Sequence, residues 1–215
     1  MEKFISANEA AAFAKDGMTI MIGGFLGNGA PEKIIDALVA SGVKDLTVIC
    51  NDTGFTNIGV GKLFDNHQVK KAIVSYSGGN PASIEQLNAG TLNIEYVPQG
   101  TLAERVRAGG CGLGGVLTPT GLGTLAAQEK QIISVDGRDF LLEKPLRADV
   151  AFIRASTGDK AGNLLYRGAS QNFNPLMAMA ANIVVAEVAQ LLETGDIPPE
   201  NVRTQSIFVN YMVTN

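Results

Sequence analysis

Short apolar runs recur along the chain, and helical patterns separate them. Several runs are apolar at every position, which is typical of strands covered on both faces of a parallel sheet. We expect strands at Met18–Ile22, Leu46–Cys50, Lys71–Tyr76, Ile94–Pro98, Asp149–Arg154 and Asn182–Glu187.

The segments between these strands predict helices. Pro31–Ser41 places apolar residues at helical spacing and is followed by Gly42, a residue type common just past a helix end. The other expected helices are Ala82–Ala89, Thr101–Ala108 and a short one that a capping box opens at Ser6 and that ends at Gly17.

This alternation indicates an α/β fold with an open, mostly parallel sheet flanked by helices. Asp136-Gly137 lies between the two β-type runs Gln131–Val135 and Arg138–Leu142, which predicts a hairpin and thus a small antiparallel excursion. Neither a linker nor a block of like charges divides the chain, so we expect a single domain, 1–215.

Composition excludes several classes of protein. An apolar content of 46% argues against disorder, and a net charge of −4 argues against nonspecific nucleic-acid binding. No apolar run approaches the ~18 residues of a membrane span, and the N-terminus does not resemble a signal peptide. Charged residues make up only 18%, which suggests that a partner covers part of the surface.

Histidine and cysteine are too scarce for several common chemistries. His67 is the one histidine and lies in a polar turn, so neither a Ser-His-Asp triad nor a histidine-based metal site is expected. Cys50 and Cys111 are far apart and form neither a disulfide framework nor a metal-binding spacing. We therefore expect reduced cysteines, a cytoplasmic location and no metal.

The ends of the predicted strands carry glycines and neutral amides. Ligands of open α/β sheets bind beyond the carboxyl ends of the strands. Asn51 and Gln99 each follow a strand directly, where they either donate hydrogen bonds to a ligand or simply cap turns. The first strand leads into a loop of Gly23, Gly24, Phe25, Leu26, Gly27, Asn28 and Gly29, which we call the glycine loop.

Four glycines in the seven residues of this loop exceed what one tight turn requires. With Pro31 at the first helical position, the loop suggests an anion site or oxyanion hole at a helix N-terminus. It fits neither G-x-G-x-x-G nor the Walker A pattern. A second cluster, Gly109–Gly115 with Thr118–Thr124 after it, predicts a long irregular loop that is either functional or merely flexible.

The run Asp16–Pro31 resembles the signature of the family I CoA-transferases, and more narrowly that of the alpha subunit of acetate/butyrate–acetoacetate and 3-oxoacid CoA-transferases. The resemblance continues through Asn51-Asp52-Thr53, Val97–Thr101, the second glycine cluster with Thr118–Gly121, Gly162-Asn163-Leu164 and Asn172-Phe173-Asn174-Pro175. It covers nearly the whole chain.

The resemblance implies a ping-pong transfer of coenzyme A between an acyl-CoA and a free carboxylate, within short-chain fatty acid and ketone body metabolism. The nucleophilic glutamate belongs to the beta subunit, in Glu-Asn-Gly or Glu-Ser-Gly, and neither tripeptide occurs here. It implies a complex of two alpha and two beta chains, a CoA-binding role for Gly23–Gly29, and donor roles for Gln99 and Asn51. Glu187, at a strand end, is a weak fallback nucleophile, and Glu193 looks like part of a helix C-cap.

Two other classes stay open from the residues alone. A sugar-phosphate or nucleotide binding module of related α/β architecture could also use glycine loops at strand ends, but the glycine loop has no basic residue for a phosphate. A nicotinamide-dependent enzyme would need G-x-G-x-x-G and an acidic ribose ligand after the second strand. Asp52 makes only a weak case for that ligand, and we expect no nicotinamide.

Overall fold

The computed structural model describes residues 3–214. The strands of the main sheet are β1 (Thr19–Ile22), β2 (Leu46–Ile49), β3 (Val69–Val74), β4 (Asn93–Tyr96), β8 (Ala148–Asp159), β10 (Ala181–Leu192) and β11 (Tyr211–Val213), with β9 (Leu164–Leu165) antiparallel beside β8. A separate antiparallel sheet contains β5 (Val116–Thr118), β6 (Ile132–Val135) and β7 (Arg138–Glu143). The α-helices are α1 (Ala7–Ala11), α2 (Glu32–Ser41), α3 (Gly61–Asp65), α4 (Pro81–Asn88), α5 (Gln99–Gly110) and α6 (Asn174–Met179).

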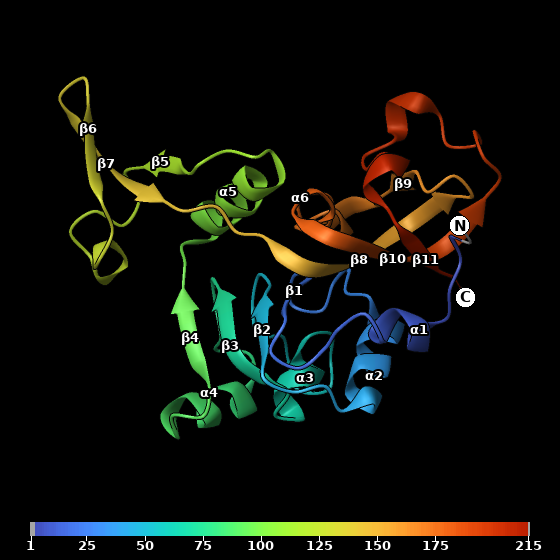
Figure 1. Cartoon of the computed structure of the whole chain (residues 1–215), viewed down its shortest axis with the longest axis horizontal. Coiled ribbons are helices and arrows are strands. Elements are labelled where there is room, and N and C mark those ends of the chain that lie inside the picture. The colour runs from blue at the N-terminus through green and yellow to red at the C-terminus, as the bar shows by residue number, and fades with distance from the viewer. Residues whose placement is uncertain (1–2, 215) are drawn as a thin grey trace.

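The main sheet has the order β11-β10-β8-β1-β2-β3-β4, and neighbours in this order are parallel (Figure 1). The chain adds β2, β3 and β4 on one side of β1, and then returns to add β8, β10 and β11 on the other. Since crossovers between parallel strands are right-handed, this reversal places the later helices on the opposite face. Figure 1 shows α2, α3 and α4 below the sheet and α5 and α6 above it. The expected open α/β architecture is confirmed.

Each face of the sheet has its own apolar core. Ile20 and Ile22 of β1 pack with α1, α2 and α3, whereas Met21 between them faces α5 and α6. All three side chains are almost fully buried, as expected for a strand covered on both faces. The loop that leaves β1 therefore starts from a strand that is packed on both faces.

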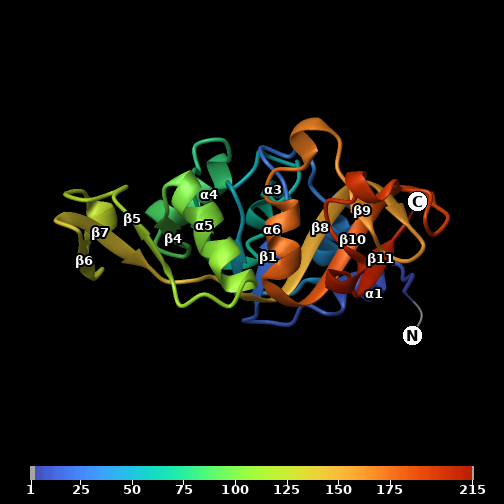
Figure 2. The same ribbon diagram turned by 90° about the horizontal axis from the view of Figure 1, so that it is seen from above.

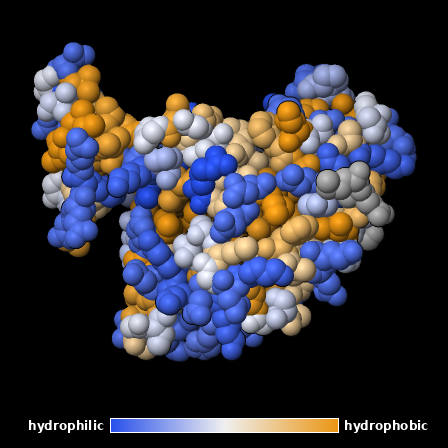
Figure 3. All heavy atoms as spheres, in the orientation of Figure 1, coloured by the Kyte–Doolittle hydropathy of each residue, from blue (hydrophilic) through white to orange (hydrophobic). Residues whose placement is uncertain are grey.

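The small antiparallel sheet stands apart from the main sheet, beyond α5 (Figures 1 and 2). Asp136 and Gly137 both have positive φ and join β6 to β7 in the expected hairpin. Large apolar residues lie on its surface, including Ile132 and Leu117, and Figure 3 shows hydrophobic residues gathered on this projection.

Several sequence-based expectations need correction. The second glycine cluster is not one irregular loop, because Gly109 and Gly110 end α5 and β5 follows. A Cβ on Gly109 would lie 1.9 Å from the Leu146 carbonyl oxygen, so these glycines permit close packing of the helix. Glu193 follows β10 and caps no helix, and Glu187 lies inside β10 rather than at a strand end.

One short helix is shorter than predicted, and three other short elements are absent from the sequence-based prediction. The capping box at Ser6 is confirmed, but its helix ends at Ala11, before Gly17. Helices α3 and α6 and strand β11 have five, six and three residues, too few to show a hydrophobic period. Among residues 3–214, we find no helix with the length and apolar character that a bilayer crossing requires.

Candidate active site

Strands β1 to β4 end at the same edge of the sheet, so their outgoing loops meet there. The structure brings together the two amides that the sequence singled out. Gln99 Nε2 donates to Asn51 Oδ1 over 2.6 Å, although 48 residues separate them. Asn51 is 3% exposed, whereas Gln99, the first residue of α5, is exposed.

The two amides of this hydrogen bond differ in how accessible they are to a ligand. Asn51 Nδ2 donates to Asp52 Oδ2 at 2.6 Å, and the Asn51 backbone carbonyl accepts from Ser75. Asn51 is thus enclosed by protein partners and orients the Gln99 side chain. A carboxamide nitrogen carries two N–H groups, so Gln99 retains a second one after bonding to Asn51. No side-chain hydrogen bond caps the N-terminus of α5, where Gln99 lies.

Asp52 is a site residue that the sequence analysis did not assign. Its Oδ2 accepts the Leu26 N–H at 2.9 Å, and its Oδ1 accepts the Gly54 N–H at 2.8 Å. One buried carboxylate therefore fastens the loops that follow β1 and β2. An acidic residue at a strand end beside a glycine-rich turn is the signal that could have identified it.

The loop after β2 repeats the glycine loop thirty residues later. Gly24-Phe25 and Gly29 of the first loop correspond to Gly54-Phe55 and Gly59 of the second, and all four glycines have positive φ. Each loop closes on itself through an isolated bridge, Phe25 with Asn28 and Phe55 with Ile58. The loops lie side by side, because a Cβ on Gly27 would come within 2.4 Å of Ile58 Cγ2.

The segment before α6 supports the glycine loop from the other side. Asn172 accepts the Gly24 N–H at 3.1 Å and donates to the Asn28 carbonyl at 3.1 Å. Asn174 donates to the Gly29 carbonyl at 3.1 Å, and a Cβ on Gly23 would lie 1.8 Å from Asn174 Oδ1. The loop's glycines thus allow contact with two asparagines.

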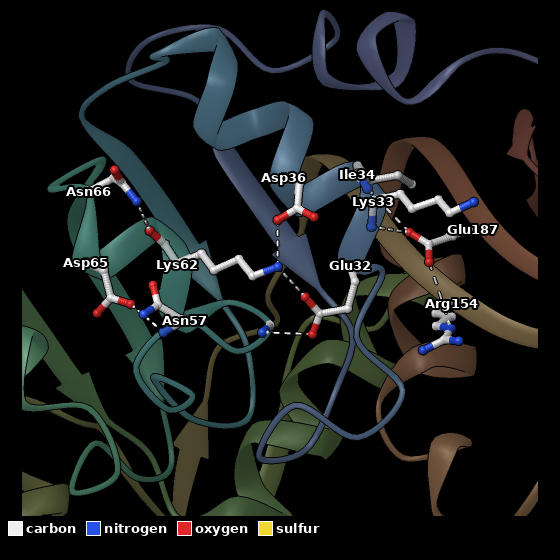
Figure 4. Close-up of polar contacts among 11 residues, drawn as sticks. Glu32, Lys33, Ile34, Asp36, Asn57, Lys62, Asp65, Asn66, Arg154 and Glu187 are labelled. Atoms are coloured by element: carbon white, nitrogen blue, oxygen red, sulfur yellow. Dashed lines mark hydrogen bonds and ion pairs between the residues drawn. The ribbon is translucent and has the colours of Figure 1, made fainter. Parts of the chain in front are cut away.

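The N-terminus of α2 does not offer the anion site that the sequence suggested. Glu187 reaches across from β10, and its Oε2 accepts the N–H groups of Lys33 at 2.8 Å and Ile34 at 3.3 Å (Figure 4). Pro31 is the residue before the helix rather than its first residue. A carboxylate of the chain itself therefore occupies the position where an external anion would bind.

Glu187 is 6% exposed, and burial raises the pKa of its carboxyl above the usual value. The backbone hydrogen bonds from Ile34 and Lys33 and the charge of Arg154, whose Nε lies 3.9 Å from Oε1, act in the opposite direction. In a separate group of contacts on the same helix, Lys62 bridges Glu32 at 2.7 Å and Asp36 at 2.5 Å (Figure 4). Both groups hold α2, which follows the glycine loop.

A cavity of about 340 Å³ opens next to Gln99, between the start of α5 and α6. Its walls carry mainly apolar surface, and no acidic, basic, cysteine, serine or threonine side chain of the described residues lines it. The lining residues are Phe25, Gln99, Gly100, Ala103, Asn172, Phe173 and Leu176. The site thus supplies a fixed amide donor and an apolar wall but no nucleophile.

The remaining candidates lie elsewhere. His67 is exposed in the turn after α3, as expected, and Cys50 is buried while Cys111 is exposed. Burial raises the pKa of the Cys50 thiol well above its usual value. Within residues 3–214, no three His, Cys, Asp or Glu side chains are grouped so that they could hold a metal ion.

The family model for coenzyme A transferases matches residues 4–215. The chain belongs to the Coenzyme A transferase family. It is 52% identical over 211 residues to the acetoacetyl-CoA:acetate/butyrate CoA transferase alpha subunit of Clostridium acetobutylicum, covering 98% of this chain and 97% of that one. It is 46% identical over 213 residues to the acetate CoA-transferase subunit alpha of Escherichia coli K12, covering 99% of this chain and 97% of that one.

Solved structures of Coenzyme A transferases share the fold. The acyl-CoA transferase of Escherichia coli O157:H7, in a thioester complex with CoA, superposes with a TM-score of 0.87 at 21% identity. The match covers 99% of this chain and 47% of that chain, so this Coenzyme A transferase chain spans about half of the solved one. The resemblance inferred from the glycine loop is confirmed at the level of family and fold.

Proposed function

We propose that this chain is the alpha subunit of a CoA-transferase that moves CoA between a short-chain acyl-CoA and a free carboxylate of the acetate, butyrate or acetoacetate type. The observation that carries the proposal is a donor site without a nucleophile. Gln99 presents an exposed amide that Asn51 holds in place, and the cavity beside it has no group able to attack a thioester. The relatives are named alpha subunits, which supports a beta subunit as the source of that group.

The proposed reaction has two covalent stages, and coenzyme A enters as substrate and product. A glutamate of the beta subunit attacks the acyl-CoA carbonyl, which forms an acyl anhydride and releases CoA thiolate. The thiolate then attacks the glutamyl carbonyl of the anhydride, giving a glutamyl-CoA thioester and the free carboxylate. The acceptor carboxylate runs the same steps in reverse.

Each attack places negative charge on a former carbonyl oxygen. Gln99 is suited to stabilise it, because a donor already held by Asn51 needs no reorganisation when the charge develops. The amide is also neutral, so it does not hold an anionic substrate as tightly as a lysine would. We assign Asn51 to positioning Gln99, and Gly23–Gly29 to binding CoA beside it.

The test is reconstitution. We expect no CoA transfer from acetoacetyl-CoA to acetate by this chain alone, and transfer once it is co-purified with its beta subunit, in a complex with two copies of each chain. Substantial turnover by the isolated chain would reject the assignment. The absence of a metal and of a nicotinamide cofactor, and the cytoplasmic location, stay predictions.

A further inference from the structure

A second cavity, about 450 Å³ in volume, borders the glycine loop. Phe25 of this loop lines the cavity of the candidate active site, whereas Asn28 and Gly29 line the second cavity. The other walls come from β8, β10 and the segment between β9 and α6. We call it the arginine pocket, because Arg154 and Arg167 belong to its lining.

The arginine pocket has a positively charged lining. Two arginines line it, and no Asp or Glu of the described residues does. The Arg154 Nε lies 3.9 Å from Glu187 Oε1, and Figure 4 shows the end of this guanidinium directed away from Glu187. Arg167 is exposed, and its guanidinium has no hydrogen-bond or ion-pair partner within residues 3–214. Both guanidinium groups therefore keep N–H donors for an anion.

Hydrogen bonds fix both arginines relative to the glycine loop. Asn174 Nδ2 donates to the Gly29 carbonyl at 3.1 Å, and Asn174 Oδ1 accepts the Arg154 N–H at 2.9 Å. Ser156 Oγ, from the same strand as Arg154, accepts the Arg167 N–H at 2.9 Å. The backbone around the arginine pocket is thus in place before any ligand binds.

We propose that the arginine pocket binds phosphate groups of the nucleotide end of coenzyme A. The inference rests on the proposed function and adds a second binding site for the same substrate. The glycine loop itself contains no basic residue that could hold a phosphate, and Arg154 and Arg167 supply two beside it. An arginine presents a planar set of donors that matches the oxygens of a phosphate group.

Coenzyme A suits the two cavities because its two ends differ in charge. The thioester lies at the end of an uncharged, flexible pantetheine arm, and the phosphates lie at the nucleotide end. The cavity beside Gln99 has no basic lining residue, so the phosphates would have no counter-charge there. A molecule that crosses the glycine loop places its thioester at Gln99 and its phosphates between Arg154 and Arg167.

The experiment compares two thioesters in the complex with the beta subunit, with acetate as the acceptor. Acetoacetyl-CoA contains the nucleotide end, and acetoacetyl-pantetheine lacks it together with all phosphates. Arg167→Gln should lower kcat/KM about tenfold for acetoacetyl-CoA, because a guanidinium–phosphate contact is lost. It should leave kcat/KM for acetoacetyl-pantetheine unchanged, which also shows that the variant is folded. Calorimetric titration with free CoA should show the same tenfold loss of affinity.

Two further variants separate a specific contact from a general effect of charge. Arg167→Lys keeps the charge and should lose less than Arg167→Gln, since lysine contacts phosphate as a point charge. Arg138→Gln makes the same change on β7, in the small antiparallel sheet, and should alter neither kcat/KM nor the affinity for CoA.

Each outcome decides the inference. Unchanged values for both thioesters in Arg167→Gln would show that the pocket does not bind CoA, and an equal loss for both would assign Arg167 to the fold or to the reacting end. Inorganic phosphate is the last probe: if it binds to the wild type and not to Arg167→Gln, while both bind CoA equally, the pocket serves another phosphate compound and the inference fails. If the wild-type complex transfers no CoA, the proposed function is rejected, and the titration with CoA still tests the pocket.

Discussion

Gln99 is open to a ligand, whereas Asn51 is enclosed by other residues of the chain. Gln99 is exposed at the start of α5, whereas Asn51 is enclosed and bonded to Asp52 and Gln99. If Gln99 stabilises the developing oxyanion, Gln99→Ala should lower kcat by about 10²–10³ and change KM little. Steady-state kinetics and a thermal melt of the complex measure both effects. Gln205→Ala, another exposed glutamine, is the matched control; a wild-type kcat for Gln99→Ala would exclude its catalytic role.

A double-mutant cycle tests whether Asn51 acts through Gln99. Asn51→Ala removes the acceptor that orients the Gln99 amide, so kcat should fall less than for Gln99→Ala. In the double variant, the loss should not exceed that of Gln99→Ala, because the group that Asn51 positions is already gone. If the two losses multiply instead, Asn51 contacts the substrate directly and is a second donor.

Part of this site was predictable from the sequence. Gln99 and Asn51 were predicted because amides at the ends of parallel strands share an edge of the sheet. Asp52, Asn172 and Asn174 were not assigned, because their roles are hydrogen bonds to backbone N–H and carbonyl groups of the glycine loop. Such partners depend on the exact path of a loop, which no side-chain pattern specifies.

At the scale of elements, α2 and the glycine loop depend on an acid from another strand. Glu187 accepts the first-turn N–H groups of Lys33 and Ile34, so Glu187→Ala should lower the free energy of unfolding by about 1–2 kcal/mol. Glu187→Gln keeps an oxygen acceptor and should cost less. Denaturant unfolding of the three proteins measures the difference; equal stability of all three would contradict the capping role.

The burial of Glu187 also predicts that the free energy of unfolding depends on pH. Burial raises the pKa of Glu187 above 4.5 in the folded state, so the folded chain holds this proton more tightly than the unfolded chain. The stability that the folded chain gains from the protonated Glu187 carboxyl is fully present below about pH 4.5, and it is lost as pH rises through the raised pKa. The free energy of unfolding of the wild type, relative to Glu187→Gln, should therefore decrease from pH 4 to pH 7. Unfolding curves across this range check the sign, and a relative increase would show that the hydrogen bonds outweigh burial.

Elements with a clear apolar run or helical spacing followed from the sequence, whereas α3, α6 and β11 did not. The four first strands, α2, α4, α5 and the β6–β7 hairpin lie close to their predicted ranges. The predictions for β8 and β10 were too short, because these strands continue to Asp159 and Leu192 rather than ending at Arg154 and Glu187. The glycine cluster at the end of α5 predicts a loop, because glycine weakens helices in general. Contact of Gly109 with the Leu146 carbonyl and of Gly110 with Met179 overrides that preference, and only the three-dimensional structure shows those contacts.

For the whole molecule, the position of the acidic residues bears on where the covalent intermediate forms. No carboxylate of the described residues lines the cavity at Gln99. Glu187 is buried against the backbone of α2, and Glu193 pairs with Lys160 at 2.6 Å at the exposed end of β10. Large apolar residues remain exposed at the sheet edge, including Phe25 and Phe55, as expected of a surface that a partner covers. These positions are consistent with the proposal that a second chain completes the site.

Chemical trapping can locate the nucleophile directly. Incubating the complex with acyl-CoA should convert one glutamate to its CoA thioester, and borohydride should then reduce that carbonyl to a primary alcohol and release CoA. We expect mass spectrometry to find the alcohol on a beta-subunit peptide, with Glu187 and Glu193 of this chain unmodified. A sample without acyl-CoA serves as the control, since borohydride does not reduce a free carboxylate. An alcohol at Glu187 or Glu193 would show that this chain carries the nucleophile, and the two subunits would then have to exchange the roles assigned to them.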